Sequence, residues 1–153
     1  MKIITLTQGQ VAKVDDVDFE WLSQWKWRAT YTNSIKSYYA ERGFLGKHIL
    51  MHRVLLNPND GYQVDHIDGD PLNNQRANLR ICTSSQNACN RKMNADNKSG
   101  YKGVTAHGKR WRVTIKHLGV FHHIGVFDTA LEAAQEYDKA AKKYHGVFAR
   151  LNF

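Results

Sequence analysis

One stretch of the sequence gathers five asparagines around a single histidine, VDHIDGDPLNNQRANLRICTSSQNACNR, running from Val64 to Arg91. Within it, Asp65 and His66 are adjacent. Carboxylate and amide oxygens are hard donors, and two such ligands with water and phosphate form a common shell for Mg²⁺ in proteins. A histidine beside such a metal has a pKa near neutral and can take a proton from an attacking water. These residue types therefore suit metal-assisted hydrolysis of a phosphodiester bond.

Four residues of this stretch divide the chemistry among them. Asp65 and Asn87 would supply the metal-binding oxygens, and His66 would take the proton from water. Asn78 would do neither, because its amide can bridge backbone groups of a loop and so hold His66 in place. A purely structural interpretation stays open on residue types alone, since asparagines cluster in loops for their tolerance of left-handed backbone.

The elements that must position these residues are two strands, a loop and a helix. The hydrophobic alternation and the turn-forming residues predict them in that stretch of the chain. The predicted order is strand, loop, strand and helix, at residues 62–67, 68–78, 79–82 and 83–91. The helix begins with a capping box from Thr83 to Gln86. If it packs against the hairpin, Asn87 points back at Asp65 and His66.

The N-terminal part of the chain, residues 1–60, is expected to hold short strands and one helix. The strand-like runs are KIITL, KSYYAE and KHILMHRVLL. Acidic side chains suit a helix N-terminus, so the helix is expected to begin near Asp16 or Asp18. Its apolar stripe, at a spacing of three residues, consists of Phe19, Leu22 and Trp25.

The C-terminal part of the chain predicts a sheet with one helix. Residues 93–100, MNADNKSG, are polar and predict a linker. Three strand-like runs follow, broken at His107-Gly108 and Leu118-Gly119. A second capping box at 129–132 opens a helix that ends before Gly146. The simplest architecture is a small three-stranded antiparallel sheet plus one helix, which makes the whole chain α+β.

Positive charge is concentrated in the C-terminal part. The formal net charge is +8, of which residues 98–153 carry +6, from 10 basic and 4 acidic side chains. Between Lys98 and Lys116 there are six basic residues and no acidic one. Such a patch is expected of a protein that binds a polyanion, although solvated basic faces are also common.

Length and cysteine usage narrow the class of protein. The 153 residues suit one compact domain or two small ones. The chain has neither the roughly 18 consecutive apolar residues of a membrane span nor a secretory signal, so a cytoplasmic protein without a membrane partner is expected. Cys82 and Cys89 form no C-x-x-C pair, which excludes a four-cysteine zinc site, and two free thiols are expected.

The stretch from DHIDGD to QNACNR resembles the catalytic motif of HNH endonucleases, in their homing-endonuclease branch. The resemblance implies that His66 is the general base and Asn78 the structural asparagine. It makes Asp65 and Asn87 the metal ligands, with Asn90 as the second choice for the last position. It further implies that the protein binds a divalent cation, with Mg²⁺ preferred to Mn²⁺, and that it has no structural zinc. Enzymes of this kind often come from phages or mobile elements.

A second resemblance covers the C-terminal part, through the motifs YKGV, W-x-V-x-I, IGVFDT, EAAQEYDKAA and LNF. The pattern is similar to the plant ethylene-response-factor DNA-binding domain, the APETALA-two fold, whose sheet lies in the major groove with the helix behind it. Thr105 and Thr114 stand where the plant domains carry an arginine and a glutamate, so plant target specificity is not implied. Residues 1–92 are predicted to form a nuclease domain, whose ββα-metal (HNH) core spans about 62–92. A linker at 93–100 and a DNA-binding domain at 101–153 follow.

Double-stranded DNA is therefore the expected partner. Strand alternation separates an exposed face of the predicted sheet from a core face, on which Trp111 is expected to pack rather than to stack on a base. The expected DNA contacts are Lys102, Lys109, Arg110, Arg112, Thr114, Lys116 and His122. Four arginines are candidates for binding phosphate beside the metal: Arg53, Arg76, Arg80 and Arg91. For each of them, a solvated surface charge is an equally open interpretation.

The preferred interpretation is a metal-dependent DNA endonuclease, monomeric and without a small-molecule cofactor. The main alternative is a DNA-binding regulator whose HNH unit has lost activity; the presence of all four motif residues argues against it. An RNA-binding protein would fit the charge but lacks the aromatic single-strand signature of an RRM-type sheet.

Overall fold

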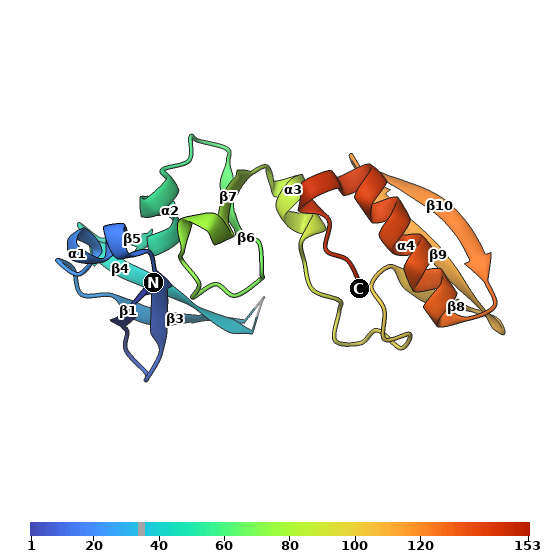
Figure 1. Cartoon of the computed structure of the whole chain (residues 1–153), viewed down its shortest axis with the longest axis horizontal. Helices are drawn as coiled ribbons and strands as arrows, with labels where there is room; N and C mark the ends of the chain where they lie inside the picture. The colour runs from blue at the N-terminus through green and yellow to red at the C-terminus, as the bar shows by residue number, and fades with distance from the viewer. Residues whose placement is uncertain (34–35) are drawn as a thin grey trace. The chain divides into compact units, whose positions relative to one another are not determined.

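The computed structural model of the chain describes residues 1–33 and 36–153 (Figure 1). The chain divides into two compact units, Met1–Ser84 and Ser85–Phe153. This division falls earlier than the predicted boundary at residues 92 and 93. No helix of the described residues is long and apolar enough to cross a membrane.

The first unit is built from antiparallel sheets and short helices. Its strands pair as β1–β2, as β3-β4-β5 and as the hairpin β6–β7. The strands are β1 (Lys2–Thr5), β2 (Val11–Val14), β3 (Arg28–Thr32), β4 (Ser37–Phe44), β5 (Lys47–Leu50), β6 (Gln63–His66) and β7 (Leu79–Cys82). The helices are α1 (Asp16–Leu22), α2 (Met51–Leu56) and the 3₁₀ turn η1 (Arg76–Asn78).

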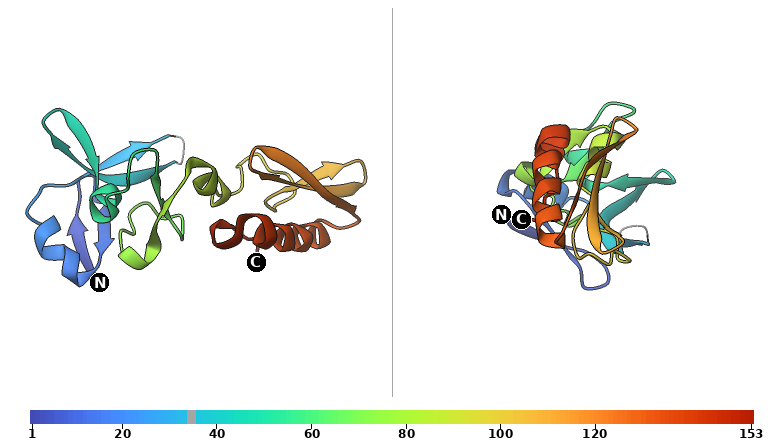
Figure 2. Two further views of the ribbon diagram at one scale, coloured as in Figure 1. Left: turned by 90° about the horizontal axis from the view of Figure 1, so that it is seen from above. Right: turned by 90° about the vertical axis from the view of Figure 1, so that its right-hand side faces the viewer.

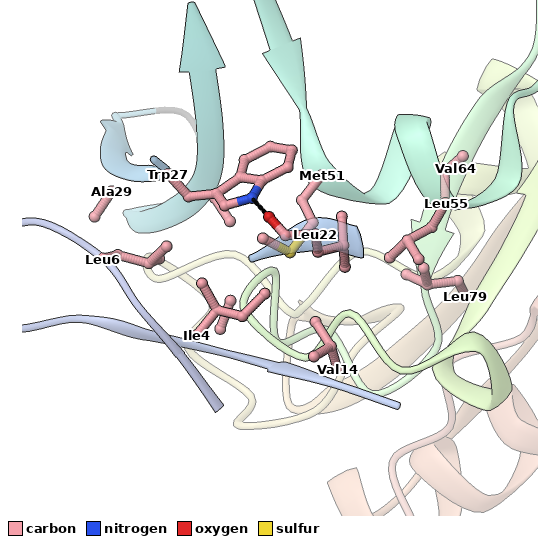
Figure 3. Packing of buried hydrophobic residues seen from close by; sticks show 12 residues of the cluster. Ile4, Leu6, Val14, Leu22, Trp27, Ala29, Met51, Leu55, Val64 and Leu79 are labelled. Carbon is pink, nitrogen blue, oxygen red and sulfur yellow. Dashed lines mark hydrogen bonds between the residues drawn. The ribbon is translucent and has the colours of Figure 1, made fainter. Parts of the chain in front are cut away.

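One hydrophobic core joins these elements. Trp27, Leu22 and Met51 are almost fully buried at its centre, and the indole Nε1 of Trp27 donates a 2.9 Å hydrogen bond to the carbonyl of Leu22 (Figure 3). Val64 of β6 and Leu79 of β7 belong to the same core. Burial of apolar surface therefore fixes the hairpin, which carries the predicted catalytic residues, to the N-terminal half of the unit.

Two predictions for the N-terminal part need correction. The run KHILMHRVLL is not one strand: β5 ends at Leu50 and α2 begins at Met51. Met51, His52 and Leu55 are its buried residues, a helical spacing that an uninterrupted apolar run conceals. The predicted stripe on the first helix is shorter than expected, because α1 ends at Leu22 and Trp25 packs on the core from beyond the helix.

The second unit contains the predicted three-stranded antiparallel sheet and helix, which confirms that part of the fold class. The strand order is β10-β9-β8, with α4 lying along the sheet (Figure 2). Thr129 caps α4, since its hydroxyl accepts a 3.1 Å hydrogen bond from the backbone N–H of Glu132. The elements are α3 (Ser84–Cys89), β8 (Val104–His107), β9 (Arg110–His117), β10 (Val120–Phe127), α4 (Ala130–His145) and the 3₁₀ turn η2 (Gly146–Phe148).

The alternation predicted for the central strand is confirmed on β9. Val113 and Ile115 are buried, and Trp111 packs partly buried on the same core, so it is a packing residue. The opposite face carries Arg110, Arg112, Thr114 and Lys116.

The predicted linker, residues 93–100, is partly an ordered turn. The side-chain Oδ1 of Asn97 accepts hydrogen bonds from the backbone N–H groups of Ser99 at 2.8 Å and Gly100 at 3.1 Å. An asparagine that binds the backbone ahead of it forms a local turn, which composition alone does not separate from a flexible linker. Both cysteines are free thiols, as expected.

Candidate active site

Asn78 braces the loop between β6 and β7. Its Oδ1 accepts a 3.0 Å hydrogen bond from the backbone N–H of Asp68, and its Nδ2 donates to the Asp68 carboxylate at 2.9 Å and to the Asn73 carbonyl at 2.8 Å. Its own carbonyl accepts from the backbone N–H of Ile67 at 2.9 Å. The side chain thus makes bridges between groups of the loop that follows His66, as predicted from the sequence.

The N-terminal segment holds the same loop from the other side. The backbone N–H of Lys13 in β2 donates to the Leu72 carbonyl, and the Lys13 carbonyl accepts from Asn74, both at 2.8 Å. Asp15, the residue before α1, accepts hydrogen bonds from Gln75 Nε2 at 3.2 Å and from the backbone N–H of Arg76 at 2.8 Å. Lys13 of β2 and Asp15 before α1 therefore help to hold the loop in place.

Arg76, a predicted phosphate-binding residue, also helps to hold the loop in place. Its Nε and Nη2 bind the two carboxylate oxygens of Asp18 at 2.7 Å and 2.8 Å. Such bidentate pairs are strong and geometrically specific. The hydrogen bonds from Arg76 hold the pKa of Asp18 below its usual value, against the opposing effect of burial.

His66 is buried at the end of β6 with only 6% of its surface exposed. Its ring lies 5.0 Å from that of His52 on α2 and 6.2 Å from that of Tyr39 on β4, measured between centroids. Two elements far from the motif in sequence thus fix the position of the imidazole.

Burial lowers the pKa of His66, while Asn74 hydrogen bonding and the charges of Asp68, Asp65 and Asp70 oppose the shift. The lowered pKa favours the neutral imidazole, the form that can accept a proton.

Asp65, a predicted metal ligand, is paired with Arg80, a predicted phosphate-binding residue. Both Nε and Nη2 of Arg80 bind its Oδ2. Carboxylate and amide oxygens such as those of Asp65 and Asn87 fit Mg²⁺ in chemical type. A cation that binds the Asp65 carboxylate would either lie beside the Arg80 guanidinium or displace it from the carboxylate. Across residues 1–33 and 36–153, no three His, Cys, Asp or Glu side chains form a group that could hold a metal.

The remaining motif residues lie in the second unit. Asn87 and Asn90 belong to α3 and to the turn after it, and Arg91 follows on the exposed surface. Their metal-binding and phosphate-binding roles stay predictions. Arg53 lies on α2 of the first unit, where its Nη1 donates to the Tyr62 carbonyl at 3.2 Å.

The exposed face of the β8–β10 sheet carries most of the predicted DNA contacts. Lys109 lies in the exposed β8–β9 turn, and Arg110 pairs with Asp128 at 2.7 Å. Two residues of this face were not among the predicted contacts: Phe121, opposite Lys116 and 71% exposed, and His123, opposite Thr114. The pairing register of β9 and β10 decides which side chains of β10 lie on this face, and the sequence does not specify that register.

Two of the predicted DNA contacts, Lys102 and His122, also make contacts within the second unit. The ammonium group of Lys102 binds backbone carbonyls, and burial lowers its pKa to about 8. His122 is the register partner of Ile115 and stacks on Tyr144 of α4 with a centroid distance of 4.7 Å. Both side chains are thereby engaged within their own unit.

His52 and Tyr39 are site residues that sequence reasoning missed. His52 is 6% exposed, and burial lowers its pKa to about 3. Burial and the charge of Asp65 raise the pKa of Tyr39. The only signal for His52 was a histidine inside an apolar run, which is equally typical of a core position.

Comparison with known proteins shows which family the sequence resembles. The family model described as HNH endonuclease matches residues 57–89. An uncharacterized HNH endonuclease of Acanthamoeba polyphaga mimivirus is 31% identical over 134 residues, covering 86% of this chain and 68% of that protein. Protein 3.8 of Escherichia phage T7 is 38% identical over 92 residues, covering 59% of this chain and 75% of that protein.

A more limited similarity links the chain to plant transcription factors. An AP2-like ethylene-responsive transcription factor of Arabidopsis thaliana is 44% identical over 57 residues, covering 36% of this chain and 12% of that protein. No solved structure matches the chain.

Proposed function

Because the chain belongs to the HNH endonuclease family, we propose that it is a metal-dependent, homing-type endonuclease that hydrolyses phosphodiester bonds in duplex DNA. The observation that carries the proposal is the environment of His66, which is buried next to Asp65 and lies against the rings of His52 and Tyr39. Burial also lowers the pKa of His66, which favours the neutral imidazole. A neutral imidazole held by neighbouring rings is suited to general-base catalysis.

In the proposed reaction, the oxygen of a water molecule bonds to phosphorus while the bond from phosphorus to the leaving oxygen breaks. The water proton passes to a ring nitrogen of His66, and the leaving oxygen takes a proton from solvent. Asn78 keeps the loop, and with it the end of β6, in a fixed position. Arg80 pairs with Asp65 and balances the charge of its carboxylate.

Asp65 and Asn87 would hold the divalent cation, with Asn90 as the second choice at the latter position. A bound Mg²⁺, or Mn²⁺, would neutralise the phosphate and stabilise charge on the leaving oxygen.

The second unit would bind the duplex through the exposed face of its sheet. The basic residues there are of the kind that contact phosphates and base edges, and the similarity to AP2-like transcription factors supports the same use. The proposed contacts on this face are Lys109, Arg110, Arg112, Thr114 and Lys116. The viral origin of two relatives supports a role in a phage or other mobile element.

Cleavage of supercoiled plasmid and phage genomic DNA in Mg²⁺ or in EDTA tests the proposal. We expect nicking or linearisation in Mg²⁺ only. Tight duplex binding without cleavage of any DNA in Mg²⁺ or Mn²⁺ would instead indicate a DNA-binding regulator with a degenerate HNH unit.

A further inference from the structure

The side chain of Lys102 closes the end of the helix that carries Asn87. Its ammonium group donates hydrogen bonds to the carbonyls of Cys89 at 2.5 Å and Arg91 at 2.8 Å. Cys89 is the last residue of α3, where helix carbonyls have no partner within the helix. A cation at this position satisfies the Cys89 carbonyl and is favoured by the dipoles at the helix end.

The backbone of Lys102 is itself held by the C-terminal end of the chain. Its N–H donates to Asn152 Oδ1 at 2.7 Å, and its carbonyl accepts from Asn152 Nδ2 at 3.3 Å. Asn152 is in turn bound by the buried carboxylate of Asp138 on α4, through its backbone N–H at 2.9 Å and its Nδ2 at 3.0 Å. A continuous series of hydrogen bonds therefore runs from α4 to α3.

The next residue fixes the same segment sterically. Gly103 has a φ of +75°, and a Cβ there would lie 2.0 Å from Cδ2 of Tyr137 on α4. A side chain at position 103 is thus excluded by both the backbone conformation and the tyrosine ring. The backbone that presents the Lys102 side chain is seated directly on the core of the second unit.

We propose that Lys102 is a positioning residue that anchors the C-terminal end of α3, and with it Asn87, to the core of the second unit, and that it does not bind DNA phosphate. Asn87 lies in the same short helix, two residues before Cys89. The expected effect of Lys102 on metal binding rests on the proposed function, in which Asn87 is a metal ligand. The anchoring itself rests only on the contacts of Lys102.

The test compares Lys102→Met, which keeps the apolar stem and removes the ammonium, with Lys102→Arg, which restores a cationic donor. Lys109→Met is the matched control, because Lys109 is exposed on the proposed DNA-binding face. Three quantities are measured: amide hydrogen exchange across residues 85–91, the Kd for duplex DNA in EDTA at several salt concentrations, and the Mg²⁺ concentration for half-maximal cleavage.

For Lys102→Met we expect exchange at residues 85–91 to accelerate about tenfold or more, because a hydrogen bond from a charged donor is lost. The Kd for DNA should stay within about twofold and its salt dependence should not change. Lys102→Arg should recover most of the protection. Lys109→Met should show the reverse, weaker DNA binding with unchanged exchange.

The inference is overturned if Lys102→Met weakens DNA binding, reduces the salt slope by about one and leaves exchange at residues 85–91 unchanged. Exchange across α4 reports whether the unit remains folded. If that protection also falls, Lys102→Gln, which keeps a neutral donor, replaces Lys102→Met under the same criteria.

The cleavage measurement separates this inference from the proposed function. A higher Mg²⁺ requirement in Lys102→Met, by about tenfold, supports the link from Lys102 to Asn87. Faster exchange with an unchanged Mg²⁺ requirement would refute that link while leaving the anchoring established. If the wild type never cleaves DNA, the proposed function fails, and the exchange and binding data still decide whether Lys102 anchors α3.

Discussion

Arg80 binds a single carboxylate oxygen of Asp65 twice, at 2.8 Å from Nε and 2.6 Å from Nη2. Asp65 is buried, and the side chain of Arg80 is only 16% exposed. The pair therefore holds the charge of a proposed metal ligand in a region with little water. If Asp65 binds the divalent cation as proposed, the cation and the guanidinium would be alternative sources of positive charge for this carboxylate.

Replacing Arg80 tests this relationship through stability. Arg80→Met should lower the free energy of unfolding by about 3 kcal/mol, because it removes the cationic partner of a buried carboxylate. Mg²⁺ should then raise the melting temperature of Arg80→Met more than that of the wild type. Thermal unfolding with and without Mg²⁺ measures both effects. The control is Arg80→Met combined with Asp65→Asn, in which Mg²⁺ should have no such effect; an equal shift there would rule out Asp65 as the ligand.

Removing the Asn78 side chain should loosen the loop behind His66. Asn78→Ala loses three side-chain hydrogen bonds within the unit. We expect the free energy of unfolding to fall by about 2 kcal/mol, and the single-turnover cleavage rate by about 100-fold, because small displacements at a reacting centre are costly. Asn59→Ala, at an exposed position, is the control. A stable Asn78→Ala variant with wild-type cleavage would show that the loop needs no brace.

The buried His52 should make the first unit sensitive to acid. Its pKa is lowered from 6.5 to about 3 in the folded protein, so only the unfolded chain binds a proton between these values. Its contribution to stability is complete above pH 6.5 and is lost as the pH falls towards 3. At pH 5 the loss from this one group is about 2 kcal/mol.

Guanidinium unfolding at pH 7.5 and pH 5, followed by tryptophan fluorescence, measures this effect. His52→Phe keeps a ring at the site and removes the titrating group. The decrease in the free energy of unfolding between the two pH values should be about 2 kcal/mol smaller in His52→Phe than in the wild type. An identical decrease in both proteins would show that His52 is not kept neutral by the fold.

The exposed face of the second unit should bind phosphate through Arg112. Arg112→Ala should weaken binding to duplex DNA about tenfold and reduce the slope of log K against log salt by about one. Lys139→Met removes an exposed cation from α4 and should leave both values unchanged. Filter binding or fluorescence anisotropy at several salt concentrations measures them. Equal losses in the two variants would indicate attraction by net charge alone, without a binding face.

The elements that depend on local sequence signals were predictable. The β6–β7 hairpin followed from alternation and from the turn-forming residues of the loop between its strands. The cap of α4 followed from the spacing of Thr129 and Glu132. These features are set by neighbours in the chain, so a single sequence contains the information they need.

The features that depend on distant residues were not predictable. His52 and Tyr39 reach His66 only because α2 and β4 pack beside the β6–β7 hairpin, and no spacing in the sequence records this. The run that contains His52 was assigned to a strand, since a short apolar segment fits either a buried strand or a helix. Lys102 was predicted to contact DNA, and no sequence pattern indicates that its ammonium group binds the carbonyls of Cys89 and Arg91.

The most direct test of the nuclease is the single-turnover cleavage rate of His66→Ala, measured in Mg²⁺ on plasmid and phage genomic DNA at saturating protein. The proposed mechanism predicts that the variant binds duplex DNA like the wild type and cleaves about 10³-fold more slowly, because a general base contributes about 10²–10⁴ to the rate. Metal-dependent cleavage by His66→Ala at the wild-type rate would contradict the assignment of His66 as the base, and with it the proposed active site.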